Sequence, residues 1–240
     1  MPQSLRFSVV IPARNEERFI GRCLESIRTA AASCPDQVEV IVVLNRCTDC
    51  TDQIARGFGA RIVHEDARNL SIIRNVGARA SIGEILVTID ADSAMSPGTF
   101  TAIDQALSSG RTVGGGTQII PERWSSGIRT TYFFFMLFSW ITGISGGLFW
   151  CLRADFDAIV GFDEKLISAE DIDFARRLGG HGRKTNRPFS TLRAAPIVTS
   201  CRKFDAFGDW CAFRDPLLIW RLLKGTHRPT INRFFYDIDR

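Results

Sequence analysis

The stretch Ile85-Leu-Val-Thr-Ile-Asp-Ala-Asp92 consists of five apolar or β-branched residues followed by two alternating aspartates. An uninterrupted run of this kind predicts a strand, over 84–89, that is buried on both faces of a sheet. The two carboxylates follow the strand directly, so they would project into the space beyond its carboxyl end. Mg²⁺ and Mn²⁺ bind carboxylate and phosphate oxygens, which makes Asp90 and Asp92 candidate metal ligands. A solvated turn that caps the next helix is the alternative.

Strand-like and helix-like segments alternate on both sides of this strand. The other expected strands cover 7–11, 38–44, 61–64 and 113–120, and the expected helices cover 16–32, 51–58, 70–80 and 96–107. The last helix has Ser96 as its cap and Pro97 at its first position. The alternation favours right-handed βαβ units and a mostly parallel sheet. Ligands bind beyond the carboxyl ends of such strands, where Pro12, Asn45 and Asp90 lie, so these three residues should share one crevice.

The second half of the chain is less regular. Short helices are expected over 154–160 and 170–178, a strand over 197–200, and a last amphipathic helix over 213–223. The helix at 170 opens with Glu170-Asp171-Ile-Asp173, and acidic residues in a first turn complement the helix dipole. Asp171 would also be held on a rigid element, as a general base requires. Capping and catalysis both remain open as interpretations of this motif.

Composition narrows the class of protein. The 240 residues carry a net charge of +4 and include seven cysteines. The length suits a single domain over 1–240, because no Ser-, Gly- or Pro-rich linker divides the chain. The charge is too modest to indicate nucleic-acid binding, and no nucleic-acid-binding motif is present. The odd number of cysteines and an N-terminus without a signal-peptide pattern predict free thiols and a cytoplasmic location.

Several short motifs together resemble those of the family 2 glycosyltransferases. Ile11-Pro-Ala-Arg-Asn-Glu16 resembles that family's opening nucleotide-binding motif. Asn45-Arg-Cys-Thr-Asp-Cys-Thr51 stands where the family usually has an Asp-Gly-Ser-Thr-Asp-Gly-Thr loop. The remaining matches, in chain order, are Arg74-Asn-x-Gly77, Gly83-Glu84, Asp90-Ala-Asp92, Gly146-Gly147, Gly161-Phe-Asp-Glu164 and Glu170-Asp171. Each motif alone is weak, but their order and spacing over residues 7–180 are specific.

The resemblance implies an α/β protein of the GT-A fold, with a Rossmann-like, mostly parallel central sheet flanked by helices and an acceptor-binding half fused to it. The nucleotide-binding half would cover residues 1–115 and the acceptor-binding half residues 116–240. The resemblance further implies an inverting transfer of a sugar from a nucleoside-diphosphate sugar, with a UDP-sugar favoured, to an acceptor hydroxyl. The implied cofactor is Mn²⁺ or Mg²⁺.

The resemblance also assigns roles to individual residues. The implied nucleotide-binding positions are Pro12, Ala13, Arg14, Glu16, Asn45, Arg74, Asp90 and Ala91. Within this set, Asn45 and Arg74 would contact the base, and Asp90 would contact the ribose. Asp92 would hold the metal together with Asp90. Asp171 would deprotonate the acceptor hydroxyl, Glu170 would orient the acceptor, and the acceptor-binding positions are Gly146, Gly147 and Trp150.

The chain departs from the family pattern at two points. Asn45 stands where the family usually carries an aspartate for the base, although an amide can still accept and donate hydrogen bonds. The nucleotide is therefore open. No histidine lies near 195–205 to serve as a third metal ligand, and His181 and His227 are interpreted as surface residues.

The segment 130–152 contains no charged residue and is rich in Phe and Trp. Its length approaches the roughly 20 residues that span a bilayer, but three glycines interrupt it, so no membrane span is predicted. It is either a core helix followed by an acceptor loop, or an amphipathic face that meets the inner surface of the membrane or a lipid-linked acceptor. The segment 176–203, with eight Lys or Arg residues and no acid, is either a solvated basic face or a site that attracts an anionic group: the donor diphosphate, an acceptor phosphate or an anionic lipid head group.

Two other functions share these features. A nucleotidyltransferase would use similar metal and nucleotide chemistry, but no Gly-rich phosphate loop with a nearby Lys or Arg follows the first strand. A non-catalytic module that binds nucleotide-sugars could have the same fold. The presence of Asp90, Asp92 and Asp171 together favours an enzyme over such a module.

Overall fold

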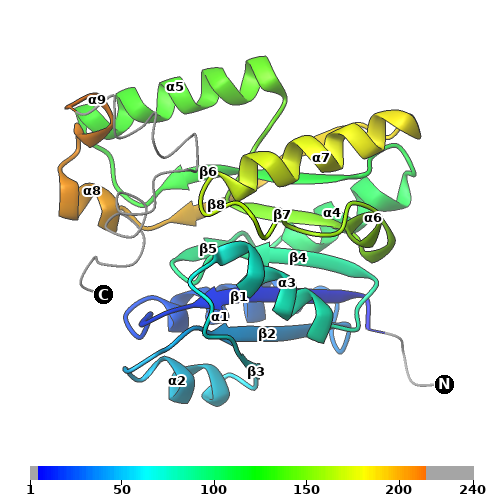
Figure 1. Ribbon diagram of the computed structural model, residues 1–240, viewed down its shortest axis with the longest axis horizontal. Helices are drawn as coiled ribbons and strands as arrows, with labels where there is room; N and C mark the ends of the chain where they lie inside the picture. Colours follow the sequence, from blue (N-terminus) through cyan, green and yellow to red (C-terminus); the bar gives the residue numbers. More distant parts are fainter. Residues whose placement is uncertain (1–4, 215–240) are drawn as a thin grey trace.

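The computed structural model describes residues 5–214, which form an eight-stranded sheet with helices on both faces (Figure 1). The strands are β1 (Phe7–Ala13), β2 (Val38–Leu44), β3 (Arg61–His64), β4 (Ile85–Ile89), β5 (Ser93–Met95), β6 (Gly114–Pro121), β7 (Leu148–Leu152) and β8 (Phe189–Thr199). Their order across the sheet is β3-β2-β1-β4-β7-β6-β8-β5. Neighbours β3, β2, β1 and β4 run parallel, as do β6 and β8, whereas β7 is antiparallel to both of its neighbours and β5 is antiparallel to β8. The expected α/β architecture is confirmed.

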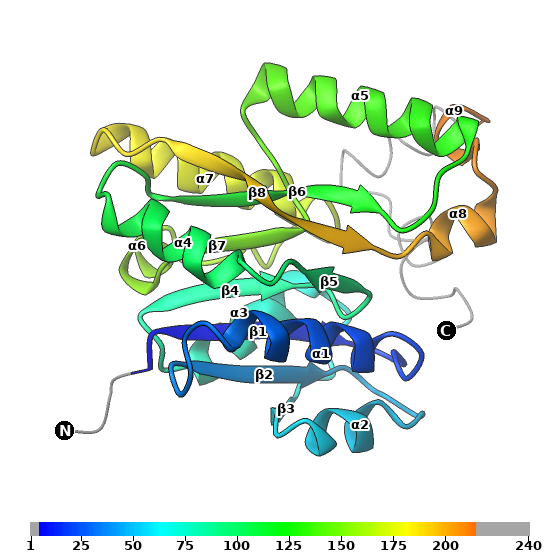
Figure 2. The same cartoon turned by 180° about the vertical axis from the view of Figure 1, so that it is seen from behind.

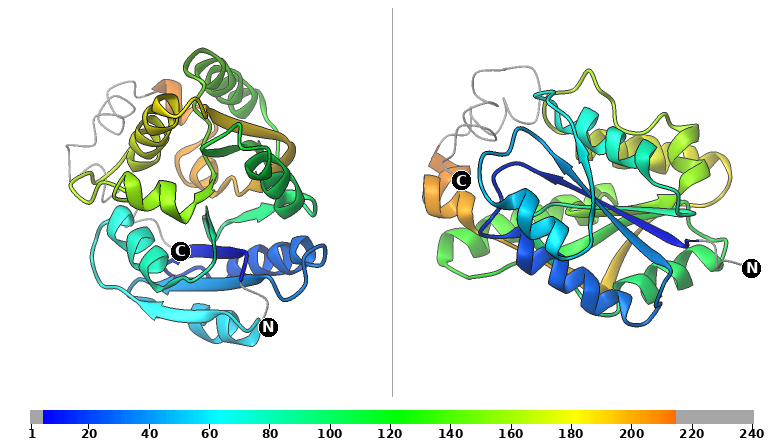
Figure 3. Two further views of the ribbon diagram at one scale, coloured as in Figure 1. Left: turned by 90° about the vertical axis from the view of Figure 1, so that its right-hand side faces the viewer. Right: turned by 90° about the horizontal axis from the view of Figure 1, so that it is seen from below.

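The helices cover the sheet in two layers. They are α1 (Ile20–Ala31), α2 (Thr51–Gly57), α3 (Leu70–Ala80), α4 (Thr99–Ser108), α5 (Ser126–Thr142), α6 (Arg153–Ala158), α7 (Glu170–Lys184), α8 (Arg202–Phe207) and α9 (Cys211–Arg214). Figure 1 shows α3 in front of β1, and Figure 2, from behind, shows α1 in front of the same strand. Figure 3 shows the two helices on opposite faces of the sheet.

The core follows from the alternation of side chains along β1. Val9 and Ile11 belong to the hydrophobic cluster that α1 covers, whereas Val10 points to the other face and packs with Ile73 of α3. The approach of α3 to the sheet depends on a glycine. A Cβ on Gly77 would lie 2.3 Å from Val10 Cγ1, a distance that no side chain tolerates.

Most expected boundaries in the first half agree with the structure, but the start of α1 does not. The helix expected from residue 16 begins at Ile20. Asn15 has a φ of 51°, in the left-handed region, so the chain turns there instead of entering a helix. The Glu16 carbonyl then accepts hydrogen bonds from the N–H groups of Phe19 and Ile20, which closes a turn ahead of α1.

The expected cap of α4 is also wrong. The helix begins at Thr99 with Gly98 as its cap residue. The Ser96 hydroxyl donates to the Pro196 carbonyl instead, and so ties this loop to β8. Between β4 and that loop lies β5, a three-residue strand that the sequence did not indicate.

The aromatic segment 130–152 contains two elements, helix α5 and strand β7. The interpretation of α5 as a core helix is wrong, because only Gly127 and Ile128 of this helix are buried. The expected strand at 197–200 is the end of the longer β8, and α8 was not expected. Of the helix expected over 213–223, the structure describes only the first residues, in α9, and the rest lies outside the described residues. No helix within 5–214 has the length and apolar character needed to cross a bilayer.

Candidate active site

A cavity of about 280 Å³ lies beyond the carboxyl ends of β1, β2 and β4. The start of α7 and the segment that joins β8 to α8 complete its wall. The expected nucleotide, metal and acceptor residues that line it are Pro12, Ala13, Arg14, Glu16, Asn45, Asp90, Ala91, Asp92 and Glu170. The crevice that the strand ends indicated is therefore present, and it brings together residues from both halves of the chain.

Hydrogen bonds fix the ends of β1 and β2 against each other. The Asn45 N–H donates to the Ala13 carbonyl at 2.8 Å. The Asn45 side chain is already engaged within the protein, because its Nδ2 donates to the carbonyls of Glu65 (2.6 Å) and Ala67 (2.9 Å). Asn45 thereby holds the segment after β3 beside the cavity. A contact between Asn45 and the base of a nucleotide stays a prediction.

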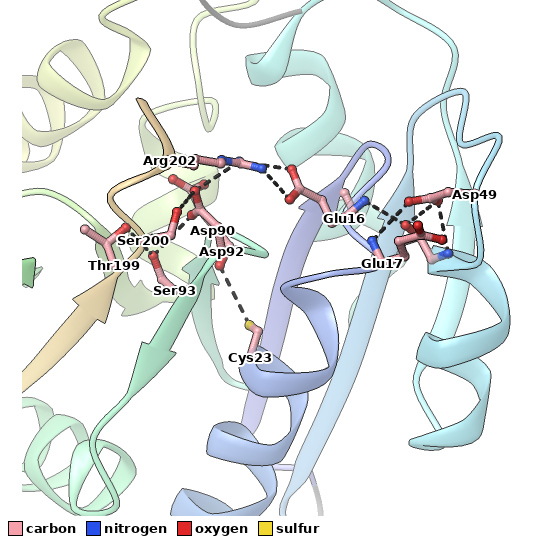
Figure 4. A network of polar contacts seen from close by, with 12 residues as sticks. Glu16, Glu17, Cys23, Asp49, Asp90, Asp92, Ser93, Thr199, Ser200 and Arg202 are labelled. Carbon is pink, nitrogen blue, oxygen red and sulfur yellow. Dashed lines mark hydrogen bonds and ion pairs between the residues drawn. The ribbon is translucent and has the colours of Figure 1, made fainter. Parts of the chain in front are cut away.

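The two aspartates that follow β4 have different surroundings. Asp92 is only 9% exposed, and its Oδ2 accepts a hydrogen bond from the Ser200 hydroxyl at 3.1 Å. The same oxygen lies 3.0 Å from a guanidinium nitrogen of Arg202 (Figure 4). The Asp90 side chain is 45% exposed, and its Oδ1 accepts from Arg74 at 2.8 Å. Asp90 can thus contact a ligand in the cavity, whereas Asp92 is held more tightly.

Arg74 connects the end of β4 to the start of α7. Its guanidinium donates to Asp90 Oδ1 at 2.8 Å and to Glu170 Oε1 at 2.7 Å, and it lies over the ring of Phe162. The burial of Arg74 disfavours its charge, but attraction from Asp90 and Glu170 outweighs burial and raises its pKa above the ordinary value. Burial also raises the pKa of Glu170, against the opposing effect of Arg74. The expected contact of Arg74 with the base stays a prediction, since its present partners are two carboxylates.

The residue that precedes the acidic first turn of helix α7 has a strained backbone. Ala169 has a φ of 57°, a left-handed conformation that costs a non-glycine residue roughly 1 kcal/mol. Asp171 follows in the first turn and is partly exposed. A Cβ placed on Gly146 would lie 3.8 Å from Asp171 Oδ2, so the loop between α5 and β7 lies beside this carboxylate. The structure therefore brings Asp171 and Gly146 together, and the roles of Asp171 as a base and of Gly146 in acceptor binding stay predictions.

The assignment of Trp150 to acceptor binding is wrong. Its side chain is 0% exposed in the core between β4 and β6, and its Nε1 donates to the Gly116 carbonyl at 3.2 Å. A residue enclosed in this way cannot contact an acceptor. Gly147, at the entry to β7, has a φ of +85° and lies against Ile119 and Ile197, which explains a glycine there on structural grounds.

Residues at the end of β8 complete the wall of the cavity and were missed by sequence reasoning. Arg202, the first residue of α8, donates to Glu16 Oε2 at 2.6 Å and to Glu16 Oε1 at 3.1 Å, in addition to its contact with Asp92. Figure 4 shows Arg202 between these two carboxylates. The available signal was the position of Ser200 at the end of the strand expected over 197–200, with Arg202 two residues later, near the end of the basic segment 176–203.

Asp90 and Asp92 suit a metal ion whose coordination shell is completed by the phosphate groups of a bound ligand. Within residues 5–214, no cluster of three or more His, Cys, Asp or Glu side chains could enclose a metal. Mg²⁺ is, however, commonly bound by one or two carboxylates together with substrate phosphates. Asp92 Oδ1 is available for this role, because its one neighbouring hydroxyl among the described residues, that of Ser93, is 3.5 Å away. Asp90 offers a second, exposed carboxylate.

Three sequence relatives cover part of the chain. The putative glycosyltransferase EpsH of Bacillus subtilis is 30% identical over 95 residues, which is 38% of this chain and 27% of EpsH. The dolichyl-phosphate beta-glucosyltransferase of Drosophila melanogaster is 30% identical over 138 residues (52% of this chain, 40% of the relative). The dodecaprenyl-phosphate galacturonate synthase of Rhizobium johnstonii is 34% identical over 103 residues (40% and 30%). The chain spans less than half of the length of these relatives.

Solved structures resemble the whole described fold. S. aureus TarS 1-349 in complex with UDP-GlcNAc aligns with a TM-score of 0.66 at 17% identity, over 97% of this chain and 71% of that TarS chain. The mannosyltransferase PcManGT from Pyrobaculum calidifontis, in complex with GDP-Man and Mn²⁺, aligns with a TM-score of 0.64 at 18% identity, over 98% and 65% of the two chains. At this level of identity the likeness concerns the fold, which is the GT-A fold of these glycosyltransferases.

The sequence itself supplies the family. Residues 8–159, more than half of the chain, match the profile described as Glycosyl transferase family 2. The matched region contains β1 through β4, the Asp-Ala-Asp motif and the loop before β7. On this evidence the chain belongs to glycosyl transferase family 2.

Proposed function

We propose that this protein transfers a sugar, with inversion, from a nucleoside-diphosphate sugar to the hydroxyl group of an acceptor. The observation that carries the proposal is the cavity that joins the Asp-Ala-Asp motif to the acidic first turn of α7. A single displacement needs a leaving group on one side of the sugar and a base on the other. Residues 1–115 would supply the nucleotide side, and residues from 116 onward would supply the acceptor side.

The donor side would combine strand-end residues with a cation. Asp92 and Asp90 would hold Mn²⁺ or Mg²⁺ together with phosphate oxygens, and the cation would stabilise the charge on the departing nucleoside diphosphate. Pro12 and Ala13 line the same cavity and would contact the nucleoside. A UDP-sugar is favoured by the family resemblance, and the two aligned structures contain UDP-GlcNAc and GDP-Man.

The acceptor side would use α7 and the loop before β7. Asp171 would accept the proton of the attacking hydroxyl, because it is the partly exposed carboxylate beside Gly146. Glu170 is buried and bonded to Arg74, so its role would be to orient the acceptor and to fix α7 relative to Asp90. Gly146 and Gly147 would form the edge of the acceptor site.

The test is a binding and hydrolysis screen with UDP, GDP and dTDP sugars in the presence of Mn²⁺, Mg²⁺ or EDTA. We expect one donor to bind and to hydrolyse slowly, and EDTA to weaken the binding of its diphosphate. Asp92→Ala should weaken Mn²⁺-dependent binding of the nucleoside diphosphate and leave the affinity for the bare nucleoside unchanged. Unchanged Mn²⁺-dependent affinity in the mutant would remove Asp92 from the metal site.

The same screen separates the two competing functions. A non-catalytic module would bind a donor without hydrolysing it under any metal condition. A nucleotidyltransferase would release pyrophosphate when it is given a nucleoside triphosphate and a sugar phosphate. The absence of a Gly-rich phosphate loop after β1 favours glycosyl transfer over this second reaction.

A second observation favours a lipid-linked acceptor at a membrane surface. The exposed side of α5 carries Phe133, Trp140 and Ile141, which are 62%, 74% and 68% exposed. The C-terminal end of α5 lies beside Arg176 and Arg183 of α7 and continues into the loop that holds Gly146. The names of two of the sequence relatives contain lipid phosphates, dolichyl phosphate and dodecaprenyl phosphate. We propose that α5 lies on an anionic membrane. In that position, Asp171 of the neighbouring helix α7 would be close to a lipid-linked acceptor.

A further inference from the structure

Arg202, the first residue of α8, lines the cavity and contacts two of its carboxylates. Its guanidinium donates two hydrogen bonds to Glu16 and lies 3.0 Å from Asp92 Oδ2, and the side chain keeps 20% of its surface exposed (Figure 4). The guanidinium also lies over the ring of Phe19, 5.1 Å from the ring centre. These contacts fix a positive charge beside the Asp-Ala-Asp motif.

The charges around the cavity explain why a cation at this place matters. Glu16, Asp90, Asp92 and Glu170 all line the cavity, and each would repel a diphosphate. Arg74 is directed to Asp90 and Glu170, and its side chain is only 7% exposed. Arg202, in contrast, lines the cavity itself and contacts Asp92 directly. An anion that enters beside Asp92 would therefore meet Arg202.

The guanidinium also has capacity for a further ligand. It carries five N–H donors in a planar fork. Within residues 5–214 its two terminal nitrogens donate to the two oxygens of Glu16, and one of them also faces Asp92 Oδ2 at 3.0 Å. The remaining donors suit two oxygens of a phosphate group, which arginine binds more specifically than lysine does.

We propose that Arg202 binds the diphosphate of the donor and shares Asp92 with the metal ion, so that nucleoside-diphosphate binding keeps a component that needs no metal. The inference rests on the proposed function, because it takes the cavity as the donor site. It adds a positioning residue from the end of β8 to the residues of β1, β2 and β4. Arg202 and the metal ion would compete for Asp92, and each would strengthen the binding of the diphosphate through its positive charge.

The test measures binding with two probes that do not depend on turnover. UDP and GDP are titrated into the full-length protein by calorimetry in EDTA and in Mn²⁺, with uridine and guanosine as controls for the nucleoside. Mn²⁺ alone is titrated by electron paramagnetic resonance. The variants are Arg202→Gln, which removes the charge, and Arg202→Lys, which keeps the charge but loses the fork. Arg123→Gln is the matched control, because Arg123 pairs with Asp205 and Asp209 at the surface near α8.

The proposal expects opposite changes for the two probes. In EDTA, Arg202→Gln should bind the nucleoside diphosphate about 10- to 100-fold more weakly, which is the usual effect of losing hydrogen bonds to a charged group. Its affinity for the nucleoside should not change. Without nucleotide, the same variant should bind Mn²⁺ more tightly, because Asp92 loses its competing partner. Arg202→Lys should lie between the wild type and Arg202→Gln, and Arg123→Gln should match the wild type.

Three results would overturn the inference and leave the proposed function standing. The first is binding of the diphosphate by the wild type in Mn²⁺ but not in EDTA. The second is equal affinity of the wild type and a folded Arg202→Gln variant in EDTA. The third is a parallel loss of nucleoside and diphosphate affinity, which would indicate that Arg202 only holds Glu16 and the cavity in shape. If the wild type binds no nucleoside diphosphate in either condition, the proposed function itself fails. If Arg202→Gln does not fold, the wild-type comparison and Arg202→Lys still decide.

Discussion

At the scale of single residues, Asp171 is the carboxylate on which the proposed reaction depends. Asp171→Asn keeps the shape of the side chain and removes its basicity. We expect turnover to fall by about 10²- to 10⁴-fold, as is typical for the loss of a general base. Donor affinity should stay near that of the wild type. Steady-state kinetics and calorimetry on the same preparation would measure the two quantities.

The neighbouring acids provide the controls for this prediction. Asp173 forms an ion pair with Arg177 at 2.6 Å, one helical turn further on, so Asp173→Asn should keep its activity. Glu170→Gln should lose less activity than Asp171→Asn if Glu170 only orients the acceptor. An active Asp171→Asn enzyme, together with an inactive variant of Glu170 or Asp173, would identify a different base.

Removal of Arg74 should lower stability strongly. Its side chain is 7% exposed and that of Glu170 is 10% exposed, so Arg74→Met would leave a buried carboxylate without its partner. Breaking a buried pair in this way typically costs about 3–5 kcal/mol. Urea unfolding would measure the loss. Arg79→Met, on the same helix, is the matched control, because the Arg79 side chain is 64% exposed and its ion pair with Glu164 should contribute little.

The same pair predicts how the loss depends on pH. Burial raises the pKa of Glu170 in the folded protein. A group with a raised folded-state pKa contributes stability that is fully present below its unfolded pKa and is lost as pH rises through the folded pKa. Removing Arg74 should raise the pKa of Glu170 further, since its cation favours the ionised form. The penalty of Arg74→Met should therefore shrink as pH is lowered from neutral towards the ordinary range of a carboxyl group. A penalty that grows on acidification would contradict the assigned pair.

At the scale of elements, the packing of α3 against the sheet gives a prediction about stability. A Cβ at Gly77 would lie 2.3 Å from Val10 Cγ1 and 2.8 Å from Val43 Cγ2, so Gly77→Ala must push α3 away from β1 and β2. We expect a loss of about 1–3 kcal/mol, the usual cost of overpacking a core. Gly57→Ala is the control, because nothing lies within 4 Å of its added Cβ and alanine favours the helix. Equal stability of both variants by thermal unfolding would show that α3 is not tightly seated.

The elements of the first half were predictable because local and tertiary preferences agree there. The apolar runs at 38–44 and 61–64 became β2 and β3 with the same bounds, and the helix over 70–80 became α3. The start of α1 was not predictable from helical spacing, because Asn15 adopts a positive φ and Glu16 is used at the cavity. The turn that places Glu16 at the cavity therefore prevails over the helical spacing of the apolar residues.

The second half was less predictable for a different physical reason. The aromatic segment 130–152 has no charged residue. Its glycines argue against one continuous helix, but no periodic pattern separates strand β7 from the loop before it. Trp150 illustrates the consequence. Its place next to the Gly146-Gly147 motif favoured a binding role, but β4 and β6, the strands on either side of β7, bury it completely. Arg202 contacts Glu16, 186 positions away, and no local pattern predicts such a pair.

At the scale of the whole molecule, the sheet connects two chemistries. The carboxyl ends of the parallel strands β1, β2 and β4 meet at the cavity, and the antiparallel strand β7 next to β4 brings the loop with Gly146 beside Asp171 of α7. Arg74 and Arg202 then hold the two sides together through ion pairs with Glu170, Glu16 and the aspartates after β4. The proposed reaction would therefore depend on contacts between residues 1–115 and the second half of the chain. The contact of α5 with a membrane would determine whether the acceptor is lipid-linked.

The position of α5 leads to the prediction about membranes. Figures 1 and 2 show α5 at the end of the molecule opposite α2, along the outer edge of the second half. Its exposed aromatic residues are accompanied by Arg129 at one end and by Arg176 and Arg183 near the other. Tryptophan and arginine are both favoured at the interface of an anionic bilayer. We expect the protein to sediment with vesicles that contain phosphatidylglycerol, and less so as the salt concentration rises.

Phe133→Glu combined with Trp140→Glu tests whether this helix makes the contact. Burial of a large aromatic side chain is worth about 1.5–3 kcal/mol, so the double variant should bind the vesicles at least about tenfold more weakly. Ile82→Glu is the matched control. Ile82 is as strongly exposed, at 68%, but it lies before β4 in the first half of the chain. Phe134 already contacts Phe213 of α9, and both residues are left in place. The wild type could instead fail to bind vesicles and form a dimer, while the double variant is monomeric. That result would identify this face of α5 as a contact between two copies of the chain.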